Sequence, residues 1–262
     1  MQLGFSGEVV HYYQKYRRGY PTPVIDALAA ALQLRPDDVV VDLGCGTGQL
    51  TLPLARRVRA VIGMDPEADM LEVARDVGRE QGLTNVTWLL GADSDVPALG
   101  TLLGDASLGA VTIGQALHWM EHDSLFRTLA PIIRSGAGVA VVTNGTPAWL
   151  QDTSWSRALR SFLEQWLGES LTFPCGSDDA SQRRYADSLR AAGFHVSETS
   201  VEYTAEMDLD HLIGGVYSAF SVDQLPAPDQ RPHFAEQIRQ ALHPADRVSE
   251  HVRVAMLIGR KG

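Results

Sequence analysis

The hydrophobic positions in the first half of the chain form short apolar runs that alternate with amphipathic stretches. The apolar runs are nearly continuous, which is typical of parallel strands buried on both faces. They predict strands at 38–43, 60–64, 86–90, 108–114 and 138–143. The stretches between them predict helices at 49–57, at 66–81 and around 124–133. Strands separated by helices indicate right-handed βαβ units and a parallel sheet with helices on both faces.

The second half has a less regular pattern. Apolar residues from Trp155 to Trp166 recur at helical spacing, so 155–167 is predicted to be a helix with one apolar face. Other helices are predicted at 181–192, near 209–218 and near 231–242, and late strands at 196–203 and 252–259. The pattern therefore predicts one α/β core with additional helices laid over one edge.

Composition excludes several classes of protein. A length of 262 residues suits one large domain, or one domain with an insertion. The net charge of -10 argues against a general nucleic-acid or anionic-membrane binder, because such proteins need a positive surface. Two cysteines cannot build a disulfide framework or a four-cysteine zinc site. The sequence contains no apolar run typical of a secretory signal or a membrane span, so a cytoplasmic protein is expected.

The most informative segment is a strand that runs directly into a glycine-rich turn. Residues 39–48 read VVVDLGCGTG, with glycine at 44, 46 and 48. Glycines permit a tight turn and let a ligand approach the backbone closely. Asp65 follows about 20 residues later, at the end of the second strand, where a carboxylate can accept hydrogen bonds from both ribose hydroxyls. The turn and Asp65 are therefore predicted to lie together at the carboxyl edge of the sheet.

Two classes of cofactor suit this geometry. A dinucleotide-binding turn normally reads GxGxxG and seats a pyrophosphate at the helix N-terminus. Here the turn reads GxGxG, and the acid Asp42 before it would repel a pyrophosphate. Asp42 suits a ligand that carries ammonium and sulfonium charges. An NAD(P)-dependent oxidoreductase is the disfavoured alternative, and a cofactor-binding protein without turnover is another.

The run DLGCGTG followed by GMDPEADML resembles the signature of class I S-adenosylmethionine-dependent methyltransferases. The resemblance covers about residues 5–145 and implies a doubly wound, mostly parallel, Rossmann-like sheet of seven strands. The implied strand order is 3-2-1-4-5-7-6, with the last strand antiparallel. It also implies a single domain, 1–262, with a cofactor-binding half at 1–145 and helical cap insertions at about 146–180 and 205–245. The residues that it places at the cofactor are Asp42, Gly44, Cys45, Gly46 and Gly48 around the methionine portion, Asp65 with Pro66 at the ribose, and Ala92 and Asp93 at the adenine.

Two more segments resemble a branch of small-molecule methyltransferases that includes the trans-aconitate-type enzymes. In the first, QALHW, the backbone at Gly114 and Gln115 would face the amino group of the cofactor. The second, YQKYRRGYP, is similar to a YxxYRPxYP segment, with Arg18 where proline is common. By that resemblance Tyr13 and Arg17 lie over the cofactor's carboxylate, with which an arginine can pair bidentately. The alternative is an amphipathic segment whose tyrosines only pack.

The methyl acceptor is expected beside His118 and Trp119. His118 is the candidate general base or hydrogen-bond partner of the acceptor, and the alternative is a histidine that packs on Trp119. Trp119 is expected to form a wall, and Tyr20 is counted with it as substrate-binding. His122 and Asp123 have no third ligand at suitable spacing, so no metal site is predicted.

Methyl transfer is an in-line displacement from an activated donor, so it requires few catalytic side chains. The predicted function is methyl transfer from S-adenosylmethionine to an oxygen, nitrogen or carbon of a small molecule, with secondary metabolism as one setting and S-adenosylhomocysteine as the product. Nucleic acid and membranes are not expected as partners, and the acceptor and the oligomeric state stay open. The cap residues that are candidates to line the acceptor site are Trp149, Trp155, Phe162, Trp166, Phe173, Tyr217 and Phe220.

Overall fold

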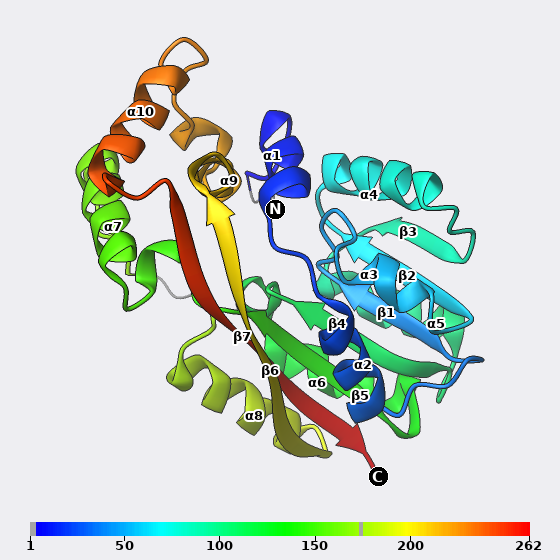
Figure 1. Ribbon diagram of the computed structural model, residues 1–262. Coiled ribbons are helices and arrows are strands. Elements are labelled where there is room, and N and C mark those ends of the chain that lie inside the picture. Colours follow the sequence, from blue (N-terminus) through cyan, green and yellow to red (C-terminus); the bar gives the residue numbers. More distant parts are fainter. Residues whose placement is uncertain (1–3, 173–174) are drawn as a thin grey trace.

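The computed structural model describes residues 4–172 and 175–262, and within these ranges the strands form a single seven-stranded sheet (Figure 1). The strands are β1 (Val39–Leu43), β2 (Ala60–Asp65), β3 (Val86–Leu90), β4 (Leu108–Gly114), β5 (Ile133–Asn144), β6 (Phe194–Asp208) and β7 (Arg247–Lys261). Their order is β3-β2-β1-β4-β5-β7-β6, and β7 is antiparallel to both of its neighbours. The predicted fold class, strand order and antiparallel last strand are confirmed.

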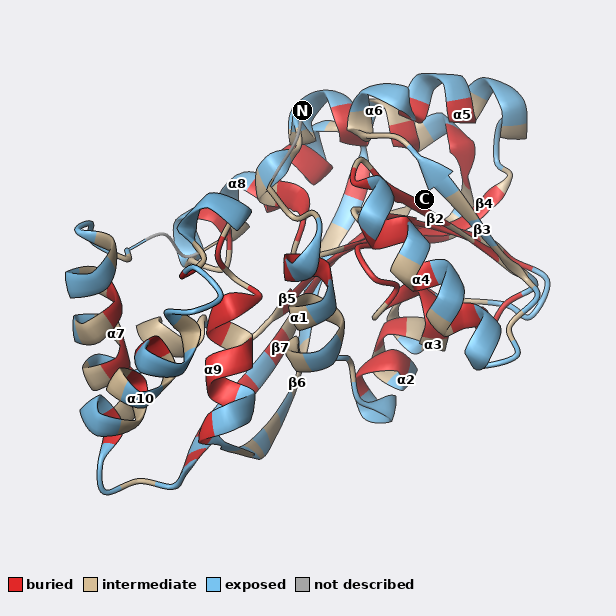
Figure 2. Cartoon of the chain, turned by 90° about the horizontal axis from the view of Figure 1, so that it is seen from above, coloured by how far each residue is buried: buried red, intermediate tan, exposed pale blue. Residues whose placement is uncertain are grey.

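Helices cover both faces of this sheet. The helices of the described ranges are α1 (Glu8–Tyr16), α2 (Thr22–Ala31), α3 (Thr51–Ala55), α4 (Ala68–Glu80), α5 (Val96–Leu103), α6 (His122–Ile132), α7 (Ser154–Leu167), α8 (Asp179–Ala191), α9 (Leu209–Tyr217) and α10 (Arg231–Leu242). One apolar core lies between the sheet and α5, α6 and α8, and another between the sheet and α2 and α3. Figure 2 shows buried residues gathered on the strands and on the inward sides of the helices. The strand β4 is buried along almost its whole length, which explains its continuous apolar sequence.

The last two strands extend beyond the sheet and carry a separate group of helices, α7, α9 and α10, which we call the cap. β6 and β7 pair without a break from Phe194 opposite Lys261 to Asp208 opposite Arg247. The helices α9 and α10 lie in the connection between these two strands (Figure 1). The cap has its own apolar core, in which Phe234 is fully buried. This core makes the cap a packed unit at one end of the long ribbon.

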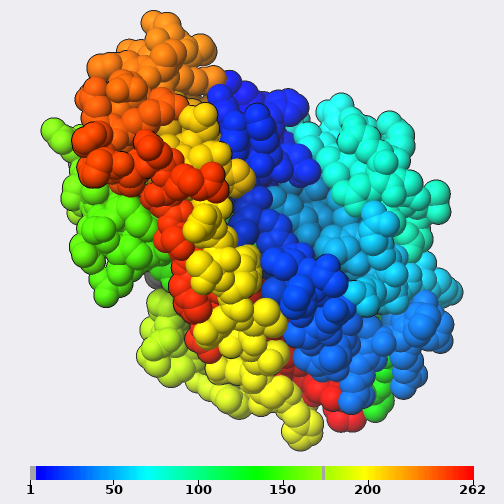
Figure 3. Space-filling view, in the orientation of Figure 1, coloured from blue at the N-terminus to red at the C-terminus, as the bar shows by residue number. Residues whose placement is uncertain are grey.

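The N-terminal helix α1 lies between the cap and the cofactor-binding half that the sequence predicts. Figure 3 shows this blue segment on the surface between the orange and yellow cap and the cyan segment that contains α4. On the cap side Glu8 forms a bidentate ion pair with Arg231, and the ring of Tyr16 lies so close to Gly214 that no side chain would fit there. On the other side the backbone N–H that precedes α1 donates to Asp69 of α4 at 2.7 Å. One helix therefore joins the two parts of the molecule.

Several elements differ from the sequence predictions. The hydrophobic pattern does not predict α1, α2 or α5, and it predicts a longer α3. It also predicts shorter late strands, because the ends of β6 and β7 alternate buried and exposed residues instead of forming apolar runs. These ends pair with each other outside the main sheet, where one face of the ribbon contacts solvent. Within residues 4–172 and 175–262, no helix is long and apolar enough to cross a membrane.

Candidate functional site

The glycine turn connects β1 to α3 and is held against the end of β2. The N–H groups of Gly44 and Cys45 both donate to the carbonyl of Met64, at 2.8 and 3.1 Å. Gly44 has a φ of 65°. A Cβ at that position would lie 2.4 Å from the Cβ of Ala116, so only glycine fits. Burial raises the pKa of the Cys45 thiol, which indicates packing and not a nucleophile.

Asp65 fastens this turn to the start of α4. Its Oδ2 accepts the N–H of Gly46 at 2.8 Å, and its Oδ1 accepts the N–H of Glu67 at 2.9 Å. Pro66 lies between Asp65 and Glu67 and has no N–H, so the next available donor is that of Glu67. Burial raises the pKa of Asp65, while the two backbone hydrogen bonds act in the opposite direction. Each carboxylate oxygen still has a lone pair, so Asp65 can accept further hydrogen bonds from a ligand.

Asp42 is buried beneath the turn. Its Oδ2 accepts the hydroxyl of Thr51 at 2.5 Å, and its Oδ1 accepts the hydroxyl of Thr112 at 2.7 Å. Burial raises the pKa of this carboxyl to about 6, against the effect of the two hydroxyls, and the negative charge of Asp65 adds to the rise. Asp42 therefore joins β1, α3 and β4, and it supplies negative charge close to neutral pH.

The helix α1 covers the turn from outside. The ring of Tyr13 lies 3.7 Å from the position that a Cβ would take at Gly46. The guanidinium of Arg17 lies 5.1 Å from the centre of the Tyr13 ring and donates to the carbonyl of Ser218 at 3.3 Å. Its Nε is buried and has no hydrogen-bond partner, and none of the described ion pairs includes Arg17. A guanidinium in this condition suits a ligand carboxylate.

The predicted adenine segment lies at the end of β3. The N–H of Ala92 donates to Asp95 at 2.9 Å, which closes a short turn. Asp93 accepts the N–H of Glu121 through its Oδ2, also at 2.9 Å. One oxygen of Asp93 therefore fixes the loop after β4, and the other oxygen remains for a ligand.

The chain after β4 adopts a left-handed conformation at Gln115, with a φ of 55°. The N–H of Gln115 donates to the carbonyl of Val142 at 2.9 Å, which keeps the backbone close to β5. The side-chain Oε1 of Gln115 is buried and has no hydrogen-bond partner within residues 4–172 and 175–262. Gly114 precedes Gln115, and a Cβ at Gly114 would lie 2.8 Å from the hydroxyl of Tyr20. Tyr20 packs against the apolar core beneath α2.

A narrow pocket opens beside Gln115 and His118. Its volume is about 10 Å³, which is the space of one water molecule. Its lining consists of Gln115, Ala116, Leu117, His118, Val141, Val142, Thr143, Cys175, Gly176 and Tyr185. Burial lowers the pKa of His118 to about 4, so its imidazole is neutral at pH 7. Trp119 stacks at a tilt on His118, 5.0 Å between ring centres, but half of its surface faces solvent and it does not line the pocket.

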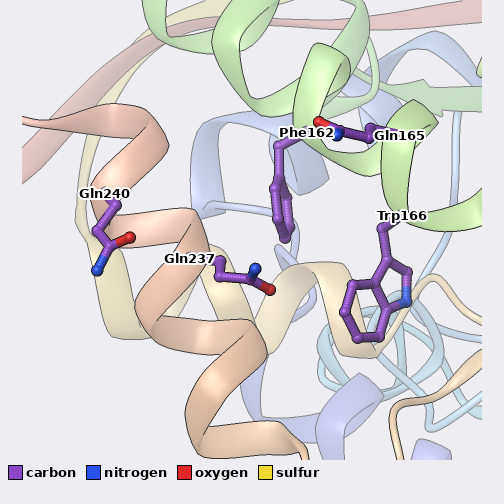
Figure 4. Close-up of a pocket in the computed structure, with 5 residues that line it drawn as sticks. All are labelled: Phe162, Gln165, Trp166, Gln237 and Gln240. Carbon is purple, nitrogen blue, oxygen red and sulfur yellow. The ribbon is translucent and has the colours of Figure 1, made fainter.

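The cap aromatics that the sequence offers as lining residues pack mainly against one another. Phe162 and Trp166 contact Phe234 with ring centres 5.3 and 4.8 Å apart. A second cavity, of about 450 Å³, lies between α7 and α10 and is lined by Phe162, Trp166 and three glutamines. Figure 4 shows the side chain of Gln237 pointing toward the two rings. Phe173 lies outside the described residues.

The structure brings the predicted residues into two neighbouring groups. Tyr13, Asp42, Asp65 and the glycines meet at the turn, and His118 lies at the pocket after β4. Sequence reasoning did not identify Thr51 and Thr112, the partners of Asp42, although a threonine inside an apolar strand is a usable signal for a buried acceptor. It also did not identify the residues from β5 and α8 that line the pocket, because nothing local marks them.

Comparison with known proteins shows which protein family this part of the chain resembles. Residues 40–136, which include the turn, Asp65 and the segment after β4, match a family model described as a methyltransferase domain. These residues are a methyltransferase domain. The prediction of a methyltransferase is thereby confirmed for residues 40–136.

Individual relatives of the methyltransferase domain cover different shares of the chain. An uncharacterized methyltransferase of Mycobacterium tuberculosis is 35% identical over 144 residues, which are 55% of this chain and 53% of that protein. The match thus spans about half the length of that relative. A 23S rRNA (uracil(1939)-C(5))-methyltransferase of Xanthomonas oryzae is 47% identical over 62 residues, which are 24% of this chain and 14% of that protein. Among solved structures, a proposed type II methyltransferase from Anaeromyxobacter dehalogenans has a TM-score of 0.62 at 22% identity, over 94% of this chain and 98% of that one. This last likeness supports the fold.

Proposed function

We propose that this chain binds S-adenosylmethionine at the glycine turn and transfers its methyl group to a small molecule. The observation that carries the proposal is the condition of Arg17, a partly buried cation above the turn without an acidic partner among the described residues. At the turn itself, the buried hydroxyl of Thr47 also has no hydrogen-bond partner among the described residues. Buried polar atoms normally have hydrogen-bond partners, so two unpartnered polar groups at the glycine turn favour a bound molecule there.

The residues at the turn fit this cofactor in charge and in position. Arg17 would hold its carboxylate, and Asp65 would accept hydrogen bonds from its ribose. Asp42 lies buried below, where its negative charge favours the amino and sulfonium groups of the cofactor. The same charge opposes a pyrophosphate, which is why we do not favour an NAD(P)-dependent oxidoreductase. Gly44, Gly46 and Gly48 leave the space that side chains would fill.

In the proposed mechanism S-adenosylmethionine supplies an activated methyl group, and the chain positions the acceptor and excludes water. Tyr13 and Arg17 on α1 close the site from outside. His118 is neutral at pH 7, so it is able to accept a hydrogen bond or a proton from the acceptor. Its low pKa makes it a weak base, and we therefore assign it to orientation of the acceptor more than to proton removal.

The segments 146–180 and 205–245 are proposed to act as the cap that selects the acceptor. α9 contacts α1 closely, so the cap is attached to the helix that covers the turn. The net charge of -10 disfavours a polyanionic acceptor such as nucleic acid, which supports a small neutral or amine-bearing molecule. A cytoplasmic location remains a prediction from the sequence.

Calorimetric titration tests the cofactor assignment directly. We expect S-adenosylhomocysteine to bind with a 1:1 stoichiometry and NADH to give no heat of binding. Binding of NADH without binding of S-adenosylhomocysteine would overturn the proposal. Turnover is then tested by incubation with S-adenosylmethionine that carries a radiolabelled methyl group, followed by extraction of labelled small molecules. A protein that binds the cofactor but labels no candidate acceptor would support the binding protein without turnover.

A further inference from the structure

The pocket after β4 has a size and a chemistry that limit what can enter it. It holds one water-sized group, and charged side chains are missing from its described lining. The polar atoms that surround it come from Gln115, Thr143 and Tyr185, with the neutral imidazole of His118 and the Cys175 thiol, whose pKa burial raises. A carboxylate or phosphate in such a pocket would lose its hydration without gaining a counter-charge, which is costly. For an uncharged group of the size of water, this desolvation free energy is much smaller.

Gln115 indicates which kind of uncharged group fits. Its Oε1 is buried and lacks a donor among the described residues, and its backbone has the left-handed φ of 55° that side chains other than glycine rarely adopt. An unsatisfied buried acceptor and a strained backbone are both unfavourable in isolation. Their coincidence at one residue that lines the pocket points to a ligand that donates a hydrogen bond to Oε1.

We propose that Gln115 orients the methyl acceptor, and that the group which enters the pocket is an uncharged N–H or O–H. This inference rests on the proposed function. The half-exposed ring of Trp119, next to His118, gives the rest of the acceptor an apolar surface at the mouth of the pocket. The acceptor is therefore a neutral amine, amide or hydroxyl compound.

The reaction balances with the groups at hand. The nitrogen or oxygen lone pair forms a bond to the methyl carbon of S-adenosylmethionine. The bond between that carbon and sulfur breaks, and its electron pair stays on sulfur as S-adenosylhomocysteine. The hydrogen held by Gln115 leaves as a proton, to His118 or to water. Burial raises the pKa of Cys175, and the positive charge of Arg17 opposes this rise, so Arg17 lies near enough to act on the pocket. In the proposed complex the carboxylate of the cofactor pairs with Arg17.

The test uses the whole protein saturated with S-adenosylhomocysteine, whose binding is first measured by calorimetry. Four probes share one ring, namely aniline, phenol, toluene and benzoate, and their dissociation constants are measured by NMR titration at pH 7. We expect aniline and phenol to bind about 3- to 10-fold more tightly than toluene, as one hydrogen bond predicts, and benzoate to bind most weakly. The two donor probes separate nitrogen from oxygen acceptors.

Variants assign the effect to Gln115. Gln115→Met keeps the length of the side chain and removes the acceptor, so aniline and phenol should bind only as well as toluene. Gln115→Asn tolerates the left-handed backbone and retracts the oxygen, and it should give the same loss if the methionine variant does not fold. The control is Gln165→Met, in the cavity between α7 and α10, which should leave all four constants unchanged.

The outcomes separate the inference from the proposed function. Absence of S-adenosylhomocysteine binding would overturn the proposed function, and this inference with it. Cofactor binding together with benzoate as the tightest probe, or with aniline and phenol unaffected by both Gln115 variants, would overturn the inference alone. A loss of probe binding in Gln165→Met but not in the Gln115 variants would place the probes in the cap cavity and would also overturn it.

Discussion

Replacement of Asp65 by alanine tests the connection between the glycine turn and the second strand. In the wild type Asp65 accepts two backbone N–H groups, from Gly46 at 2.8 Å and from Glu67 at 2.9 Å, and only 7% of its surface is exposed. Asp65→Ala leaves both donors without a partner. Each unsatisfied buried donor costs about 1–3 kcal/mol.

The expected net loss of stability is smaller than the sum of these two costs. Burial raises the pKa of Asp65, so at pH 7 its charge is itself unfavourable in the folded protein, and the variant recovers part of that energy. We expect the free energy of unfolding to fall by about 2–4 kcal/mol. The affinity for S-adenosylhomocysteine should fall by about 1–3 kcal/mol, roughly 5- to 150-fold, because the ribose also loses an acceptor.

The measurements are urea denaturation with linear extrapolation and calorimetric titration of the cofactor product. Asp69→Ala is the matched control, because Asp69 also accepts one backbone N–H, that of Gly7 at 2.7 Å, but at an exposed position where water replaces it. The control should lose less than about 1 kcal/mol. If the free energy of unfolding of Asp65→Ala lies within about 0.5 kcal/mol of the wild-type value, which is about the error of the extrapolation, the structural role that we give to Asp65 is wrong. If the variant binds S-adenosylhomocysteine with wild-type affinity, the binding role is wrong.

Three further predictions concern the same edge of the sheet. Burial raises the pKa of Asp42 to about 6, so its contribution to stability is complete below its ordinary pKa and is lost as the pH rises through about 6. Its attraction for the ammonium group of S-adenosylhomocysteine, by contrast, needs the ionised form. Calorimetry should therefore show that the affinity for S-adenosylhomocysteine falls below a pH of about 6 in the wild type but not in Asp42→Asn, and equal pH dependence in both would refute this. Gly44→Ala places a Cβ 2.4 Å from that of Ala116, and urea denaturation should show a free energy of unfolding lower by about 2–4 kcal/mol. The control Gly82→Ala has a similar φ of 69° but no atom within 4 Å of the new Cβ, so it should lose only about 1 kcal/mol. Equal losses of stability in the two variants would contradict a steric clash at Gly44. Arg17→Met should weaken S-adenosylhomocysteine about 10- to 100-fold by calorimetry and leave 5′-methylthioadenosine, which has no carboxylate, unchanged; an equal loss for both ligands would contradict a contact with the carboxylate.

The parallel part of the sheet could be predicted well because burial on both faces leaves a clear mark on the sequence. β1, β2, β3 and β4 begin and end within one residue of the predicted strands. The late strands were underestimated for the opposite reason. Their outer parts pair only with each other and keep one face in solvent, so their pattern alternates instead of being continuously apolar.

In the candidate site, too, the sequence predicts the placement of some residues and not of others. That the turn and Asp65 lie together could be predicted, because they end neighbouring strands and because the turn needs glycine, whose positive φ is found at Gly44. The surroundings of Trp119 and Tyr20 could not be predicted from the sequence, because the exposure and packing of these side chains depend on elements elsewhere in the chain. In the structure half of the Trp119 side chain is exposed beside His118, and Tyr20 packs against an apolar core with its hydroxyl next to Gly114.

The sequence by itself determined the family, the strand order that the family implies and the turn that is to hold the cofactor, because local geometry and burial leave regular traces in a chain. Only the tertiary structure decided which hydroxyls bind Asp42, and that Arg17 and the Oε1 of Gln115, a residue of the pocket lining, have no acidic partner and no hydrogen-bond donor, respectively, among the described residues. These features join residues that lie far apart in the sequence, such as Asp42 and Thr112, 70 positions apart, and Arg17 and Ser218, 201 positions apart. The chain brings them together only when the sheet, α1 and the cap have packed. Our proposal that the acceptor is a neutral hydrogen-bond donor therefore rests on the packed structure and not on the motif.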